Sequence, residues 1–179
     1  MHKLVVMGVA GSGKSHLAER LARHLGCPMV EGDHFHLDAS QEKMRAGIPL
    51  EDADRVPWLD RLGALLATRS GDVVLACSAL KRKYRDLLRA QVPDLRFVYI
   101  AIDLQTAAQR VGARTGHLFP RSLVTSQFAA LESPLGEEGV FEVSALHPTE
   151  AQVGAVAGWL ASAPTPALPQ WGRERRSLN

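Results

Sequence analysis

The sequence predicts an α/β domain in which a parallel sheet carries helices on both faces. Three observations support this prediction. Short apolar runs typical of buried strands alternate with stretches whose apolar residues recur at helical spacing. The first apolar run, residues 3–7, passes through a glycine-rich loop directly into a helix. The length of 179 residues suits one domain with a full hydrophobic core.

Each expected strand is a short apolar run that a turn or a helix follows. The first, Lys-Leu-Val-Val-Met, and the third, with Val-Val-Leu-Ala-Cys at its centre, have the continuous apolar pattern of strands buried on both faces. The five strands are expected at residues 3–7, 28–30, 72–77, 95–102 and 140–143.

The helices are recognised by apolar residues at helical spacing and by residues that start or stop helices. Gly26 and Gly47 each follow the end of a helix, and Pro93 follows another. Asp52 and Asp103 are the expected N-caps of two helices, the first of which has a proline near its start, where proline is tolerated. The helices are expected at residues 15–25, 38–47, 52–69, 81–90, 104–114, 122–131 and 149–161.

Residues 1–163 are expected to form this domain, and residues 164–179 a separate tail. Three prolines, at positions 164, 166 and 169, prevent a helix there, and a polar segment rich in arginine follows them. This composition predicts a tail that is poorly ordered or lightly docked. A basic docking segment is the alternative interpretation.

Composition and charge exclude several classes of function. The formal net charge is +2 at pH 7, and much of the positive excess lies in the tail, so the dense basic face of a nucleic-acid-binding protein is missing. Cys27 and Cys77 have neither metal-binding nor redox spacing, and both are expected to be buried free thiols. No stretch has the length of a membrane span, and the N-terminal run does not match a signal peptide. A cytoplasmic protein is therefore expected.

The glycine-rich loop fits the pattern G-x-x-x-x-G-K-[ST] of phosphate-binding loops. Its glycines let successive backbone N–H groups turn towards a phosphate, and the following helix directs its positive end at the same anion. Lys14 is expected to reach the β- and γ-phosphates, and the Ser15 hydroxyl to ligate Mg²⁺. A glycine-rich turn without a ligand is the alternative. The predicted nucleotide-binding residues here are Gly8, Val9, Ala10, Gly11, Ser12, Gly13, Lys14, Ser15 and His16.

Two carboxylates follow the second expected strand, in the order Glu31-Gly-Asp33. Ligands bind at the carboxyl edge of open parallel sheets, so both are expected near the nucleotide. Asp33 is the candidate base or orienting group for an attacking hydroxyl, and Glu31 is expected to hold water on Mg²⁺. His34 and His36 would share a face on a strand, and one is expected to bind a polyhydroxylated substrate. Solvated loop carboxylates are the alternative.

Cations in the middle of the chain suggest an anionic substrate. The planar fork of Arg55 matches a carboxylate group. Ser78 precedes a helix that begins with several cations, including Lys81 and Arg85, which is unfavourable at a helix start unless an anion is bound. A plain solvated helix face remains the alternative.

Arginines of a third segment suggest a lid over the transferred group. Arg110, Arg114 and His117 flank a glycine at a helix end, so the backbone there can bend. Arginine stabilises the charge of a transferring phosphoryl group, and a short mobile segment carrying it would act as a lid. A helix that carries surface salt bridges is the alternative.

Several runs of residues together resemble a known family. They comprise the phosphate loop, Gly32-Asp33 with His36, Lys43-Met44-x-x-Gly47-x-Pro49-Leu50, Asp54-Arg55-x-Pro57-Trp58-Leu59, Cys77-Ser78-Ala79-Leu80-Lys81-x-x-Tyr84-Arg85-Asp86-x-Leu88-Arg89, Gly116-His117 and Ser126-Gln127-Phe128-x-x-Leu131-Glu132. On the strength of these runs, the chain resembles the gluconate kinases, small P-loop kinases related to shikimate kinase, over about residues 4–159. The chain departs from the family pattern at Glu31, Leu37, Ser40, Glu51 and Leu118, where Asp, Pro, Asn, Asn and Phe are usual.

The resemblance implies a P-loop fold of three α/β/α layers with strand order 2-3-1-4-5, a lid over about residues 114–134 and a homodimer. It implies Mg²⁺-dependent phosphorylation of the terminal hydroxyl of D-gluconate by ATP. Its catalytic residues would be Lys14, Asp33 and Arg114, and Arg110 and Arg114 would also contact the nucleotide. Its substrate-binding residues would be Asp33, His36, Arg55, Ser78, Lys81, Arg85, His117 and Gln127. Another small-molecule or nucleoside monophosphate kinase, or a non-catalytic nucleotide-binding regulator, stays open, although intact Lys14, Ser15 and Asp33 argue against the regulator.

Overall fold

The computed structural model describes residues 2–113 and 121–162, with only the backbone described at residues 121 and 122. These residues form one five-stranded parallel sheet in the order β2-β3-β1-β4-β5, with helices packed on both faces. The strands are β1 (Lys3–Met7), β2 (Met29–Glu31), β3 (Val73–Ala76), β4 (Arg96–Ala101) and β5 (Val140–Ser144). The helices are α1 (Lys14–Leu25), α2 (Asp38–Arg45), α3 (Asp52–Thr68), α4 (Arg82–Gln91), α5 (Leu104–Ala113), α6 (Arg121–Ala130) and α7 (Thr149–Ser162).

Strand β1 is the centre of the sheet and is buried on both faces. It pairs with β3 on one side and with β4 on the other, so that Val5 lies between Leu75 and Phe97. Side chains alternate across a strand, and Val5 and Met7 therefore face one layer of helices while Leu4 and Val6 face the other. This double burial explains the uninterrupted apolar run of the strand.

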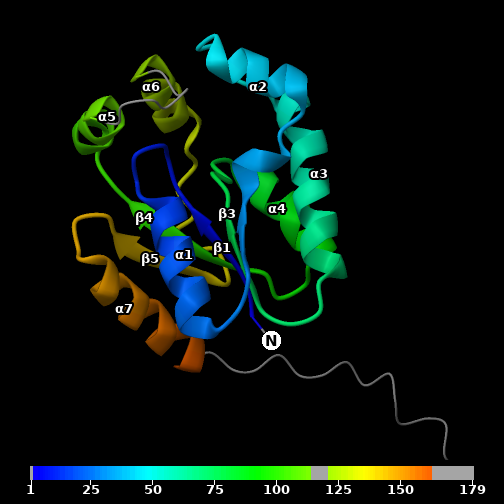
Figure 1. Cartoon of the computed structure of the whole chain (residues 1–179), viewed down its shortest axis with the longest axis vertical. Helices are drawn as coiled ribbons and strands as arrows, with labels where there is room; N and C mark the ends of the chain where they lie inside the picture. The colour runs from blue at the N-terminus through cyan, green and yellow to red at the C-terminus, as the bar shows by residue number, and fades with distance from the viewer. Residues whose placement is uncertain (1, 114–120, 163–179) are drawn as a thin grey trace, which may run out of the picture.

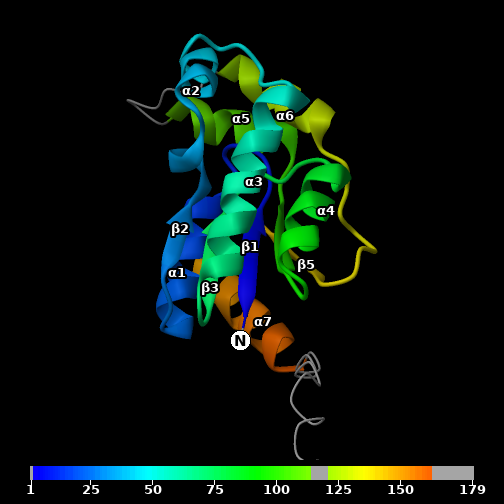
Figure 2. The same cartoon turned by 90° about the vertical axis from the view of Figure 1, so that its right-hand side faces the viewer.

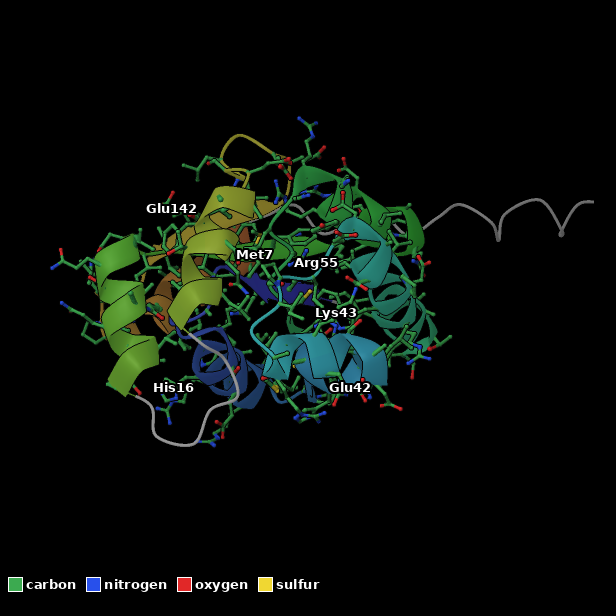
Figure 3. The ribbon with its side chains drawn as sticks, turned by 90° about the horizontal axis from the view of Figure 1, so that it is seen from above. Met7, His16, Glu42, Lys43, Arg55 and Glu142 are labelled. Atoms are coloured by element: carbon green, nitrogen blue, oxygen red, sulfur yellow. The ribbon has the colours of Figure 1, made fainter. Side chains whose placement is uncertain are left out.

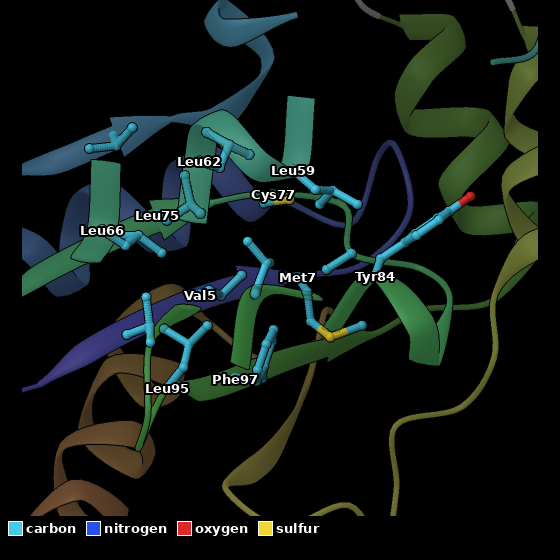
Figure 4. Close-up of a cluster of buried hydrophobic side chains, with 14 of the residues drawn as sticks. Val5, Met7, Leu59, Leu62, Leu66, Leu75, Cys77, Tyr84, Leu95 and Phe97 are labelled. Carbon is cyan, nitrogen blue, oxygen red and sulfur yellow. The ribbon is translucent and has the colours of Figure 1, made fainter. Parts of the chain in front are cut away.

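The two layers of helices cover opposite faces of the sheet (Figure 1). Helices α1 and α7 pack on the face that carries Leu4 and Val6. Helices α3 and α4 cover the other face, where Leu59, Leu62 and Tyr84 meet β1 and β3 (Figure 4). The predicted three-layer fold and strand order are confirmed.

Two local features differ from the expectations. Residues Gly32–Phe35 form a short 3₁₀ helix, η1, directly after β2, where no element was expected. Helix α3 has Glu51 as its N-cap, not Asp52, because Glu51 and Asp54 form a reciprocal capping box. The expected cap at Asp103 is confirmed, since its carboxylate accepts hydrogen bonds from the backbone and hydroxyl of Thr106.

The carboxyl ends of the strands all point to one end of the molecule. Figures 1 and 2 place α2, α5 and α6 at this end and the start of β1 at the opposite one. The loops after β1, β2 and β3 meet there, which is the position at which open parallel sheets bind ligands. None of the helices in the described part of the chain combines the length and apolar character that crossing a membrane requires.

Candidate active site

The loop between β1 and α1 is shaped by close contact with helix α5. Gly11 has a φ angle of +82°, and a Cβ atom placed on it would lie 2.6 Å from the carbonyl oxygen of Ala107. A larger residue would therefore be strained in its backbone and would also displace α5. Glycine at this position lets the loop curl tightly between α5 and the start of α1.

The amides of this loop and of the first turn of α1 form a cradle for an anion. Helix α1 begins at Lys14, and no side chain caps it. Its first amides and its positive dipole end are therefore available to a negatively charged group. The side chain of Lys14 folds back over the loop, and its ammonium group donates a hydrogen bond to the carbonyl oxygen of Val9 at 3.1 Å. The buried Ser12 hydroxyl has no hydrogen-bond partner among the described residues. This donor set suits a phosphate group.

A cleft of about 710 Å³ opens beside the cradle, between the loop, η1, and helices α2, α3 and α6. Figure 3 looks down onto this end of the molecule and shows Lys43 and Arg55 on the side of α2 and α3, with His16 lying away from them. The predicted site residues that line the cleft are Ala10, Gly11, Gly13, Lys14, Ser15, Glu31, Asp33, His36, Arg55, Ser78 and Gln127. The fold thus brings both predicted carboxylates to the phosphate loop.

Trp58 fixes the turn that carries Asp33. Its indole Nε1 donates a hydrogen bond to the carbonyl oxygen of Gly32 at 2.8 Å, and its ring stacks on His36 with centroids 4.1 Å apart. Gly32 is needed because a Cβ there would lie 2.5 Å from the carbonyl oxygen of Ala76. These contacts hold η1 against β3, and they set the position of Asp33 at the edge of the cleft.

Both histidines line the cleft, but they differ in burial, because a 3₁₀ helix takes the place of the strand that would have put them on one face. The 3₁₀ turn leaves His34 exposed and buries His36, whose side chain is only 4% exposed. His36 Nε2 lies 3.8 Å from Asp33 Oδ1, and Nδ1 has no partner among the described residues. Burial lowers the pKa of His36, although the nearby Asp33 opposes this effect. At neutral pH the ring of His36 is therefore uncharged, and it lies beside the carboxylate of Asp33.

The fully buried Cys77 thiol lies directly after β3. Burial raises the pKa of the Cys77 thiol to about 12, and Asp33, Lys14 and Glu31 each make a smaller electrostatic contribution to it. The thiol is therefore inert, as expected for a buried free cysteine. Among the described residues no group of three or more His, Cys, Asp or Glu side chains could hold a metal ion. A metal at this site would need oxygens of the bound phosphates.

Arg55 lines the cleft from the first turns of α3. Its guanidinium donates a hydrogen bond to the carbonyl oxygen of Leu50 and lies over the ring of Tyr84, 5.8 Å from the centroid. One nitrogen is thus committed to the backbone, and the remaining donors of the half-buried fork stay beside the cleft. Ser78 follows β3, and its carbonyl accepts from the amide of Gly8 at 3.4 Å, which joins the two loops.

Lys81 was expected to bind an anion in the cleft, and the structure places it elsewhere. Its ammonium group lies 2.8 Å from Asp52, which also accepts hydrogen bonds from Lys83 and Tyr84. The hydrogen bond with Asp52 raises the pKa of Lys81, and hydrogen bonds with Lys81, Lys83 and Tyr84 lower that of Asp52. The cationic start of α4 is therefore balanced by a carboxylate of α3, and no bound anion is needed to explain it.

Arg85 was also expected in the substrate pocket, but it is fully buried outside the cleft. Its guanidinium pairs with Glu137 and donates to the carbonyl oxygens of Ala79, Leu80 and Glu132. Burial alone would raise the pKa of Glu137, but hydrogen bonds with Arg85 and Arg89 outweigh it and lower the pKa. Arg85 thus ties the segment after α6 to the start of α4. With its donors so occupied, it is a structural residue.

The remaining predicted residues fall into three groups. Gln127 lines the cleft, and its Oε1 accepts a hydrogen bond from the Ala10 amide at 2.6 Å. His16 is exposed on α1, and Arg110 donates to the carbonyl oxygen of Ala145, so neither lines the cleft. The expected lid residues Arg114 and His117, and the tail from residue 164, lie outside the described residues.

Helix α2 contributes a wall of the cleft that the residue patterns did not predict. Its residues Gln41, Met44 and Arg45 face the cleft together with Ile48 from the following turn. No short motif marks such residues, because a polar helix that closes over a cleft has the same pattern as any solvated helix. The resemblance covers Met44 but assigns it no role.

The arrangement places a phosphate cradle, a lysine, an acidic side chain and an arginine around one cleft. An acceptor hydroxyl between the cradle and Asp33 could be activated and could attack a bound phosphoryl group. The geometry therefore supports phosphoryl transfer to a small acceptor that the cleft of about 710 Å³ can enclose.

Comparisons with known proteins agree with this geometry. The model of a family described as an AAA domain matches residues 4–134. Gluconokinase of Gluconobacter oxydans (strain 621H) is 47% identical over 145 residues, which cover 79% of this chain and 81% of that protein. The thermoresistant gluconokinase of Escherichia coli (strain K12) is 42% identical over 140 residues, with coverage of 76% and 80%. The crystal structure of a gluconokinase from Sinorhizobium meliloti 1021 superposes with a TM-score of 0.79 at 42% identity, covering 89% of this chain and 95% of that one.

Proposed function

The chain belongs to the gluconokinase family, and we propose that it transfers the γ-phosphoryl group of ATP to the terminal hydroxyl of D-gluconate, which gives 6-phospho-D-gluconate. The observation that carries the proposal is the single cleft that Lys14 of the phosphate loop, Asp33 of η1 and Arg55 of α3 line together. A sugar acid presents hydroxyls and a carboxylate, and these residues offer a partner for each.

The phosphate loop would hold ATP. The curled backbone at Gly11 and the uncapped start of α1 would receive the β- and γ-phosphates, and Lys14 would leave its contact with Val9 to neutralise their charge. Ser15, exposed at the start of α1, would ligate Mg²⁺, and Glu31 would hold one of its waters. When bound, Mg²⁺ would neutralise charge on the phosphate oxygens.

Asp33 would take the proton of the acceptor hydroxyl. The hydroxyl oxygen forms a bond to the γ-phosphorus, the bond from the γ-phosphorus to the bridging oxygen breaks, and ADP leaves. The exposed carboxylate of Asp33 faces the cleft while η1 is held by Trp58, which gives the base a fixed position. His36, neutral and buried, would donate or accept a hydrogen bond with a substrate hydroxyl.

Arg55 would bind the carboxylate of the sugar acid. One guanidinium nitrogen of Arg55 donates to the carbonyl oxygen of Leu50, and the other N–H donors remain beside the cleft. A carboxylate can accept two parallel hydrogen bonds from a guanidinium group. This pairing would place the carboxylate at one end of the acceptor and the terminal hydroxyl near Asp33. Ser78 would add a hydroxyl contact on the same side.

A lid over about residues 114–134 is part of the proposal, with Arg114 as a second cation for the transferring group and His117 as a substrate contact. Arginine near a helix-end glycine, and the resemblance to the family, support it. A cytoplasmic homodimer is proposed on the resemblance alone, and light scattering of the purified chain would test it.

A coupled assay of ADP release with gluconate, shikimate, glycerate and AMP tests the proposed function. Gluconate should be turned over with the highest kcat/KM, and Lys14→Met should lose nearly all activity at an unchanged circular dichroism spectrum. Arg23→Met removes a cation from the exposed far end of α1 and serves as the control. Turnover of another acceptor in place of gluconate would overturn the choice of substrate.

A further inference from the structure

Gln127 joins helix α6 to the phosphate loop across 117 positions of sequence. Its Oε1 accepts a hydrogen bond from the amide of Ala10 at 2.6 Å. The half-buried side chain also lines the cleft, beside Lys14 and Ser15. The loop amide next to Gly11 is therefore held by a side chain of α6.

This hydrogen bond determines which way the side-chain amide of Gln127 faces. A backbone N–H can only donate, so the atom nearest Ala10 must be the carbonyl oxygen of the side chain. The NH₂ group of the same planar amide then lies next to the loop as a donor. Among the described residues Nε2 has no hydrogen-bond acceptor. The fold therefore holds a donor in a fixed orientation at the edge of the phosphate cradle.

We propose that Gln127 is a further residue of the transfer site, whose Nε2 donates a hydrogen bond to an oxygen of the γ-phosphoryl group while Oε1 holds Ala10 in place. The inference rests on the proposed phosphoryl transfer from ATP. Charge spreads over the oxygens of the transferring group, and a donor that is already oriented stabilises this charge without reorganisation. The γ-phosphoryl group would thereby receive a neutral donor in addition to the single lysine of the loop.

Gln127→Glu is the decisive variant, because it keeps an acceptor for the Ala10 amide but replaces the NH₂ group with a negatively charged oxygen. A repelled γ-phosphoryl group should weaken ATP binding about tenfold or more and leave ADP binding nearly unchanged. The kcat with gluconate should fall by about 10²-fold, on the scale of other oriented donors. Gln127→Ala, which loses both the acceptor for Ala10 and the donor, should lower kcat and weaken ATP binding more than ADP binding, by less than Gln127→Glu does. Thr125→Ala, exposed on the same helix, is the control.

Isothermal titration with ATP and ADP, melting temperature and steady-state kinetics give independent readouts. A residue that only braces α6 against the loop would change both nucleotide affinities alike, and this outcome would overturn the inference. Wild-type kcat in Gln127→Glu, or a raised KM for gluconate at unchanged kcat, would also overturn it. Titration of the nucleotides needs no phosphoryl acceptor. If gluconate is the wrong substrate, the wild type will fail to turn it over, but the ratio of the ATP and ADP affinities of Gln127→Glu will not be affected.

Discussion

The ring of His36 lies flat on the indole of Trp58, with centroids 4.1 Å apart and an angle of 14° between the planes. The same indole donates its N–H to the carbonyl oxygen of Gly32. One buried tryptophan of α3 therefore holds both ends of the turn that carries Asp33. The position of the proposed base depends on a side chain that lies 25 residues further along the chain.

The buried His36 should make the stability of the protein depend on pH. Its pKa is lowered by burial, so in the folded state the ring stays neutral at a pH where the unfolded chain is already protonated. Above pH about 6.5 both states are neutral, and below it the unfolded state gains a proton that the folded state resists. As the pH falls through this window, the free energy of unfolding should drop by up to about 1.4 kcal/mol per unit more than in His36→Gln.

Urea unfolding at several pH values between 7.5 and 5 measures this difference. His34→Gln, which changes the exposed neighbour, should follow the wild-type curve. Parallel curves for the wild type and His36→Gln would show that His36 is not kept neutral by burial.

Asp33→Asn should lower kcat far more than it changes the KM for ATP. A positioned base contributes about 10²- to 10⁴-fold, and the amide cannot take the hydroxyl proton. Steady-state kinetics with gluconate and ATP measure both constants. Asp38→Asn, on the exposed start of α2 and outside the cleft, is the matched control. An unchanged kcat in Asp33→Asn would remove this residue from the chemistry.

Arg85→Met should destabilise the protein, because it leaves the nearly buried Glu137 without its main partner. Breaking such a pair by removing one member typically costs about 3–5 kcal/mol. Thermal and urea unfolding measure the loss. Arg82→Met, which removes an exposed cation from the same helix, should change stability by less than about 0.5 kcal/mol. Wild-type stability with a raised KM for gluconate would instead return Arg85 to the substrate pocket.

Arg114→Ala should lower kcat and kcat/KM together by about 10²-fold or more, as expected for an arginine that contacts the phosphoryl group only in the transition state. The prediction comes from the sequence, because Arg114 precedes a glycine, Gly116, at a predicted helix end and no acidic residue lies three or four positions away. Kinetics at saturating gluconate measure the effect. A raised KM for ATP at nearly constant kcat would make Arg114 a contact of the adenine or ribose instead.

Much of this fold and the nucleotide half of the site could be predicted from the sequence. The phosphate loop is a local structure, so its strand, glycines and helix lie together in the chain and can be read as one pattern. The strand order came from the family resemblance, and the sheet confirms it. Glu31 and Asp33 could be placed at the cleft because Glu31 ends β2 and Asp33 lies two residues beyond it, where the carboxyl end of the strand meets the ligand edge.

Only the tertiary structure decided the partners of the mid-chain cations and the walls of the acceptor side. Lys81 and Arg85 have sequence patterns that suit a substrate anion, but Asp52 and Glu137, which come from distant segments, neutralise them. The Ala10 contact of Gln127 likewise joins residues 117 positions apart. A charged side chain binds whichever opposite charge folding brings within reach, and no local pattern records that choice. The chain itself determined the chemistry available, while long-range packing determined which groups remain open to a substrate.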